Sequence, residues 1–365
     1  GTELLTAARE QWDAFAEASA NPFATHAWLT AWARARARRP VLCAALCDAG
    51  GDLLSGALLQ DLRWGLASAA DVHSGEWGTV AAGAHERRRL WREICAMGTR
   101  RVALEALREG APDAEIARAA LQAAGYGVLT PLRGLTRSPY VPLPASFDEL
   151  LASRSRHLAS QWRRKRRKLE RAGAARVRLI TGGSTLERDL DAFMAVEASG
   201  WKGRNRTAIL AERGAEQLYR DFAREAAERG WLRLLLLELD GQVLAGDLGC
   251  VLGGVGFLLK TGFDERRADL SPGIVLRGEA LREAVQEGLR GYDMLGGPDR
   301  YKLEWTDDVR PRHGLRAYTG PAGRAAALAW HAGVRPVGGR AIAYLREHPQ
   351  MRRAGASARA RIRPH

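Results

Sequence analysis

The most regular pattern of apolar and polar positions lies in the second half of the chain. Strand-like runs occupy 231–239, 242–252 and 255–263, with Asp-Gly and Gly-Gly dipeptides between them. Such dipeptides between strand-like runs are strong hairpin signals. The pattern therefore predicts a three-stranded antiparallel meander. Its first run, WLRLLLLEL, is the most apolar stretch of the chain, and its length is typical of a buried strand.

Helical periodicity surrounds this predicted meander. Helices are predicted at about 147–172, 185–199 and 215–228 before it. After it, residues 268–289 read as a loop that enters a helix, and GYDMLGG at 291–297 reads as one more strand. The first helix carries an apolar stripe at helical spacing, formed by Leu151, Leu158, Trp162 and Leu169.

The first half alternates helical and strand-like segments, which is typical of an α/β unit. SPYVPLPAS at 138–146 is extended and proline-rich, so we place a domain boundary there. The predicted organisation is an N-terminal unit at 1–146, a C-terminal unit at 147–320 that opens with a basic helix, and a basic, partly helical tail at 321–365. The expected class is α/β (α+β).

Missing motifs exclude several classes of protein. The chain has no GxGxxG or Walker A loop, which argues against nicotinamide- and ATP-binding folds, and no GxSxG elbow. Four scattered cysteines and eight dispersed histidines show no metal-ligand spacing, so no metal site is expected. No apolar run is long enough for a transmembrane helix. These features together predict a cytoplasmic protein without a disulfide framework.

The positive charge is concentrated in two places. The 365 residues carry a net charge of +14, and segments 151–171 and 321–365 contribute +8 each, so the rest is nearly neutral. Residues 163–168 are six consecutive cations, which must point around the whole helix. They indicate either a nucleic-acid contact, such as tRNA, or a solvated helix face whose apolar stripe docks on the protein.

Lysine is rare in this chain, with five lysines against fifty-one arginines. Where arginine is the default cation, a lysine is more often kept for a compact ammonium group. Lys165 and Lys168 belong to the charge run, where arginine would serve as well. Lys202, Lys260 and Lys302 each fall in a separate motif, and we expect these three near the chemistry.

Ser271, Pro272, Gly273 and Ile274 open the helix that follows the meander. Serine can cap a helix N-terminus, proline suits the first turn, and glycine lets a ligand approach the backbone. The free N–H groups and the helix dipole favour an anion such as a pyrophosphate. The plain alternative is a well-capped helix with no ligand.

The order of meander, SPG helix and strand resembles the acyl-CoA-binding half of the GNAT acyltransferase fold. Within it, the chain resembles Fem-type peptidyltransferases and the acetyltransferase-like proteins of exopolysaccharide and cellulose gene clusters. The resemblance is carried by SRSRHLASQWRRKRRKLERAG, FMAVEASGWKG, the segment 222–281 and GLRGYDMLGGPDRYKLEW, and near the N-terminus by NPFATHAWLTAW. It implies a tandem fold: two GNAT-like halves, the first degenerate, each with a mixed, largely antiparallel sheet flanked by helices.

The resemblance also implies where the site residues lie. Residues 271–274 would face the donor's pyrophosphate. Asp293 would end the strand near the cleft, followed by Tyr301 and Lys302. Trp201 and Lys202 would rim the acceptor site. We expect Asp293 as general base with Asp247 second, and Tyr301 as general acid.

Each of these residues has a structural alternative. Asp247 can belong to a β-bulge, Asp293 can cap a loop, and Tyr301 can simply pack. Lys260 either contacts a phosphate or carboxylate in the cleft, or pairs with Asp264 on the surface. Lys302 has the same ambiguity with Glu304.

Three functions remain open on this evidence. The leading hypothesis is acyl transfer from acyl-CoA, without a metal, to an amine or hydroxyl of a sugar, polysaccharide precursor or small metabolite. The second keeps the fold but takes aminoacyl-tRNA as donor, bound through the basic helix at 163–168. The third is a non-catalytic scaffold that uses a degenerate GNAT half to bind a partner.

Overall fold

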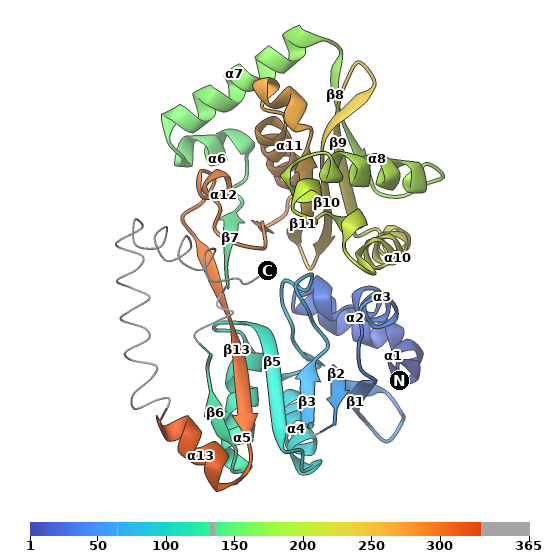
Figure 1. The fold of residues 1–365 in the computed structure, drawn as a ribbon, viewed down its shortest axis with the longest axis vertical. Helices are drawn as coiled ribbons and strands as arrows, with labels where there is room; N and C mark the ends of the chain where they lie inside the picture. Colours follow the sequence, from blue (N-terminus) through green and yellow to red (C-terminus); the bar gives the residue numbers. More distant parts are fainter. Residues whose placement is uncertain (64, 132–135, 330–365) are drawn as a thin grey trace, which may run out of the picture.

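The computed structural model describes residues 1–63, 65–131 and 136–329. Two lobes share one path of hydrogen-bonded strands, in the order β1-β2-β3-β5-β13-β7-β12-β11-β10-β9-β8 (Figure 1). Residues 330–365, most of the predicted tail, lie outside the described residues. Within the described ranges, no helix is long and apolar enough to cross a membrane.

The N-terminal lobe is a mixed sheet with helices. Its helices are α1 (Glu3–Ala7), α2 (Arg9–Ala18), α3 (His26–Ala35), α4 (Ala84–Ala96) and α5 (Pro112–Ala123). Its strands are β1 (Val41–Cys47), β2 (Leu53–Leu62), β3 (Gly65–Ser68), β4 (Val80–Ala81), β5 (Arg101–Arg108) and β6 (Gly127–Leu129).

The C-terminal lobe contains the predicted meander, which is confirmed as β9 (Leu232–Leu239), β10 (Gln242–Leu252) and β11 (Val255–Phe263). Its other strands are β7 (Thr136–Pro142), β8 (Ala175–Ile180) and β12 (Gly291–Asp293). β13 (Val309–Tyr318) starts beside β7 and runs on into the sheet of the N-terminal lobe. The helices of the C-terminal lobe are α6 (Phe147–Ser153), α7 (Arg156–Ala172), α8 (Leu186–Ala198), α9 (Trp201–Arg204), α10 (Ala215–Glu228), α11 (Pro272–Gln286) and α12 (Arg300–Leu303). The last described helix, α13 (Gly320–Ala329), packs on β6 in the N-terminal lobe.

Strand β9 is apolar throughout because both of its faces are covered. Leu234 and Leu236 pack with α8 and α10, whereas Leu235 and Leu237 pack with α7 and α11. Successive side chains of a strand point to opposite faces, so a strand between two helical layers loses the usual alternation of apolar and polar residues.

The single helix predicted at 147–172 is wrong, because the chain breaks it into α6 and α7. Ser155 adopts an extended conformation and its side chain accepts the backbone N–H of Leu158, which starts a new helix. The predicted apolar stripe is confirmed, since all four of its members are buried: Leu151, Leu158, Trp162 and Leu169.

Each lobe contains a strand from the other side of the predicted boundary. β7 pairs with β12, where Tyr140 lies opposite Asp293. β13 returns after the C-terminal meander and pairs with β5 and β6 of the N-terminal lobe. The two lobes are therefore interlocked by strand exchange, and the boundary near 146 stays a prediction.

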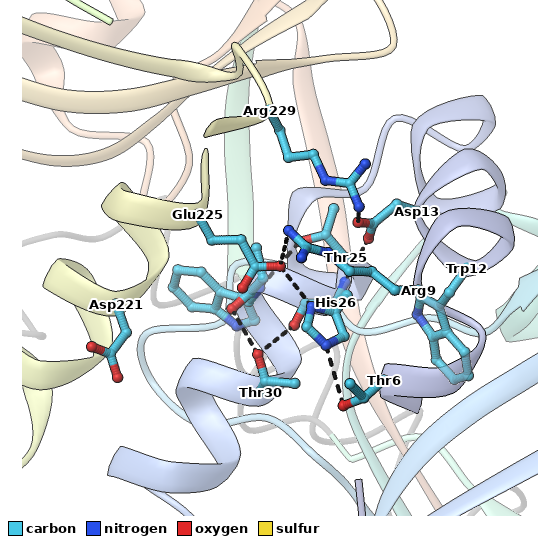
Figure 2. Close-up of polar contacts among 12 residues, drawn as sticks. Thr6, Arg9, Trp12, Asp13, Thr25, His26, Thr30, Asp221, Glu225 and Arg229 are labelled. Atoms are coloured by element: carbon cyan, nitrogen blue, oxygen red, sulfur yellow. Dashed lines mark hydrogen bonds and ion pairs between the residues drawn. The ribbon is translucent and has the colours of Figure 1, made fainter. Parts of the chain in front are cut away.

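A polar cluster joins α2 and α3 of one lobe to α10 of the other (Figure 2). Nδ1 of the buried His26 lies 2.6 Å from Glu225 Oε1, and Arg9 lies 3.0 Å from the same oxygen. Asp13 accepts the backbone N–H of His26 at 2.7 Å and lies 3.3 Å from Arg229. These paired charges fix how the lobes meet.

Candidate active site

The candidate site begins where two parallel strands part. β11 and β12 pair at only three positions, which run from Val255 opposite Gly291 to Phe257 opposite Asp293. Beyond them β11 continues, whereas Leu295, with a positive φ of 48°, turns the chain that follows β12 away from it. The gap between the two segments is thus a consequence of the backbone.

A β-bulge bends β11 at the same level. Lys260 pairs with Leu248 but Leu258 pairs with Gly249, so Leu259 is the extra residue. A cavity of about 1100 Å³ lies between the parted strands, lined by residues 258–263 on one side and 294–297 on the other.

The N-terminus of α11 closes one end of this cavity. Ser271 is left-handed (φ 53°, ψ 47°), and its carbonyl oxygen accepts the N–H groups of Ile274 at 3.1 Å and Val275 at 3.2 Å. Ser271, Gly273 and Ile274 line the cavity, whereas Pro272 is buried outside the lining. The Ser271 side chain makes no capping hydrogen bond to the described residues, so the expected side-chain cap is wrong.

Three of the five lysines line the cavity, from three separate segments: Lys202, Lys260 and Lys302. Lys202 donates to the Thr261 carbonyl oxygen at 2.6 Å and lies 3.1 Å from a Glu197 carboxylate oxygen. Lys302 and Lys260 differ in their side-chain contacts.

Lys302 pins the loop that follows β12. Its ammonium donates to the carbonyl oxygens of Leu295 at 2.8 Å and Gly297 at 3.3 Å, and lies 3.3 Å from Asp299. The partner is therefore Asp299, not Glu304. Burial lowers the pKa of Lys302, and Asp299 opposes that shift.

The Lys260 ammonium has no hydrogen bond or ion pair with any described residue. Its ammonium lies 5.4 Å from the centre of the Tyr219 ring, a cation–π distance. Asp264, the alternative partner, pairs with Arg266 instead. Burial and the neighbouring Lys202 lower the pKa of Lys260. An unpaired ammonium facing a cavity is suited to an anionic group of a ligand.

The two candidate bases lie behind the cavity wall. Asp247 is 3.0 Å from Arg277, and both side chains are 2% exposed. Asp293 lies 2.8 Å from Arg312 and accepts hydrogen bonds from Ser138 and the Leu295 N–H. The arginines of both pairs line the cavity, but neither carboxylate does. Their role as base stays a prediction, and their geometry is that of groups positioning the arginines.

Aromatic side chains form part of the cavity wall and rim. Tyr301 lies on α12, and burial raises its pKa to about 12, although Arg277 opposes the shift. Trp201 on α9 is 51% exposed at the rim, where its backbone N–H donates to Glu265 at 2.8 Å. Val72 of the N-terminal lobe is also at the rim and is 85% exposed.

Eight of the eleven predicted site residues line one cavity: Trp201, Lys202, Lys260, Ser271, Gly273, Ile274, Tyr301 and Lys302. The sequence reasoning missed the wall contributed by the N-terminal lobe, which includes Asp71 and His73, and it missed Tyr219 on α10. No motif signals these residues, because they lie far apart along the chain.

Comparison with known proteins places this geometry in a family. Residues 156–303 match the acetyltransferase (GNAT) domain family. By sequence, this part of the chain is similar to GNAT acetyltransferase domains. The GNAT domain thus spans the meander, the SPG helix and the cavity between β11 and β12. No curated protein sequence matches the chain significantly.

Solved structures of other proteins resemble this chain over both of its lobes. FemX is 14% identical, with a TM-score of 0.58 over 86% of this chain and 96% of that one. A conserved protein of unknown function from Bacteroides thetaiotaomicron VPI-5482 is 12% identical, with a TM-score of 0.56 over 86% and 97%. L-PGS from Bacillus licheniformis is 10% identical, with a TM-score of 0.51 over 93% and 97%. The expected tandem GNAT fold is confirmed.

Proposed function

We propose that this protein transfers an acyl group from acyl-CoA to an amine or hydroxyl group of a sugar, a polysaccharide precursor or a small metabolite. The observation that carries the proposal is the cavity between β11 and β12, closed at one end by the N-terminus of α11. A thioester arm fits between parted strands, and the positive end of the α11 dipole suits its pyrophosphate. The compartment in which this would occur, expected to be the cytoplasm, stays a prediction.

The residues of the cavity supply the parts that such a transfer needs. The acceptor's nucleophilic atom attacks the carbonyl carbon of the thioester, and the carbon–sulfur bond breaks. Tyr301 is protonated at neutral pH, and burial raises its pKa further, to about 12. A phenol of that pKa donates a hydrogen bond to the departing thiolate more readily than a proton. Arg277 and Lys302, on the same wall, stabilise the negative charge that develops.

Calorimetric titration with acetyl-CoA tests the donor site. We expect binding by the wild-type protein, and loss of binding in Ser271→Glu because a carboxylate repels the pyrophosphate. The matched control is Ser271→Gly, which keeps the positive φ at no steric cost and should bind as wild type does. Absence of wild-type binding at millimolar acetyl-CoA would refute the proposal.

A second candidate donor, aminoacyl-tRNA, is favoured by helix α7. Arg164, Arg167 and Arg171 are exposed there and have no ion-pair partner among the described residues. We expect tRNA affinity to fall steeply with salt, and Arg164→Glu/Arg167→Glu to reduce the slope of log affinity against log salt by about 2. Arg88→Glu/Arg92→Glu on α4 is the matched control. Salt-insensitive binding, or equal effects of both variants, would exclude this donor.

The scaffold alternative makes the opposite prediction. A non-catalytic protein would keep its cellular phenotype when Tyr301→Phe and Lys260→Met are combined, whereas either transfer reaction would lose it.

A further inference from the structure

We propose that a relay formed across the interface of the two lobes accepts the proton in this reaction, with His73 from the N-terminal lobe and Tyr219 and Glu212 from the C-terminal lobe. This inference rests on the proposed acyl transfer and adds the group that activates the acceptor. Asp247 and Asp293, the two carboxylates expected to do so, do not line the cavity. His73 and Tyr219 do line it, and they belong to different lobes.

The three side chains are close enough to share a proton path. His73 Nδ1 lies 3.1 Å from the Tyr219 hydroxyl oxygen. On the other side of the imidazole, Glu212 Oε1 lies 3.1 Å from Nε2, although without the alignment of a hydrogen bond. A carboxylate accepts protons but has none to donate. The relay requires the tautomer in which the Tyr219 hydroxyl donates to Nδ1 and the imidazole's own proton lies on Nε2, towards Glu212.

Packing holds this arrangement firmly. Tyr219 is 1% exposed, and its ring makes edge contacts with His73 at 5.5 Å and Trp28 at 6.0 Å between ring centres. The side chain of His73 is 1% exposed. Groups so enclosed keep their geometry during a reaction, which favours proton transfer over short fixed distances.

The charges around His73 suit a base at neutral pH. Burial lowers the pKa of His73, and the Lys260 ammonium lowers it further, while Asp71 and Glu212 raise it and Arg36 opposes them. The imidazole is therefore neutral before the reaction. The two nearby carboxylates are placed to stabilise the imidazolium that forms when it accepts a proton.

The proposed step conserves every proton. As the acceptor's nitrogen or oxygen bonds to the thioester carbonyl carbon, its proton passes to the Tyr219 oxygen, and the Tyr219 proton passes to His73 Nδ1. The carbon–sulfur bond then breaks and releases the thiolate. His73 returns its proton to solvent after the product leaves. Tyr219 touches the acceptor, whereas His73 and Glu212 act through it.

Two nucleophiles of different acidity test the relay while the natural acceptor is unidentified. Water needs a base to attack acetyl-CoA, whereas hydroxylamine attacks as its neutral form. We expect Tyr219→Phe to slow enzymatic hydrolysis of acetyl-CoA roughly 100-fold, the usual size of base assistance, and to slow transfer to hydroxylamine far less. Tyr126→Phe, which removes another buried hydroxyl at a distance from the cavity, is the matched control.

Equal losses with both nucleophiles would mean that Tyr219 is only structural, and would overturn the relay. Unchanged acetyl-CoA binding in Tyr219→Phe, measured by calorimetry, separates that outcome from misfolding. Absence of binding in the wild type would instead refute the proposed acyl transfer.

The pH dependence of the activity provides a second test, because the direction of each shift is predicted. Activity should fall as the pH falls through the pKa of His73. Glu212→Gln removes a charge that raises this pKa, so the acid limb should move to lower pH. Lys260→Met removes a charge that lowers it, so the limb should move to higher pH. Shifts in the same direction, or none, would overturn the assignment.

Nitrogen NMR of labelled histidine tests the resting state independently of turnover. The His73 signals, identified by their loss in His73→Gln, should report a neutral ring protonated on Nε2 at neutral pH. An imidazolium, or a proton on Nδ1, would overturn the relay.

Discussion

Asp247→Asn should destabilise the protein strongly, because it leaves the Arg277 guanidinium buried without its counter-charge. The two charges are 3.0 Å apart and each side chain is 2% exposed. At an effective dielectric constant near 20, their attraction is about 5.5 kcal/mol, most of which offsets the loss of hydration of both groups. Removing one partner keeps the hydration cost and loses the attraction, which typically costs about 3–5 kcal/mol. Asparagine still offers one oxygen to Arg277, so we expect a loss of about 3 kcal/mol.

Urea unfolding followed by circular dichroism measures this loss. The informative control is Asp247→Leu/Arg277→Met, which removes both charges and should recover most of the stability, since apolar replacements of buried ion pairs are often neutral or better. Arg277→Met alone should be as harmful as Asp247→Asn, because it leaves a buried carboxylate. A loss below about 1 kcal/mol for Asp247→Asn would refute the buried-pair reasoning.

Three further predictions concern packing, charge and pH. Gly278→Ala should cost about 1–3 kcal/mol in urea unfolding despite the better helix propensity of alanine, because its Cβ would meet Trp162 Nε1 at 1.9 Å; recovery in Gly278→Ala/Trp162→Leu would confirm the clash. Lys260→Met should stabilise the fold by about 0.5–2 kcal/mol and weaken acetyl-CoA binding, as measured by thermal unfolding and calorimetry, because it removes a half-buried unpaired ammonium. Burial raises the pKa of Glu225, but its contact with His26 and nearby arginines outweighs this and lowers it overall. This carboxylate therefore contributes stability above its unfolded pKa that is lost as the pH falls through its folded pKa, so Glu225→Gln should flatten the loss of stability in acid; an unchanged acid limb would contradict the assignment.

Local patterns predicted the C-terminal lobe well. The turn at Asp240-Gly241 and the apolar run of β9 are determined by residues that are adjacent in the sequence. The meander and α11 could therefore be predicted from the sequence alone. The break at Ser155 was missed, because the apolar stripe continues through α6 and α7 and hides the new helix start. The pairing of β13 with the N-terminal lobe was not predicted, since its partners there are about 200 residues away.

Some residues of the candidate site could likewise be predicted from the sequence, and others could not. The rarity of lysine pointed to Lys202, Lys260 and Lys302, and the SPG motif pointed to the end of the cavity that α11 closes. Composition could not reveal which carboxylates are free, because burial against Arg277 or Arg312 is decided by packing.

The sequence by itself determined the meander, the SPG helix start and the segments that carry the lysines, because these depend on short-range periodicity and residue type. Only the tertiary structure decided that the strands part at Asp293, that Lys260 has no counter-charge, and that His73 meets Tyr219 across 146 residues of chain. Such contacts depend on how the interlocked lobes pack, and no local pattern encodes them.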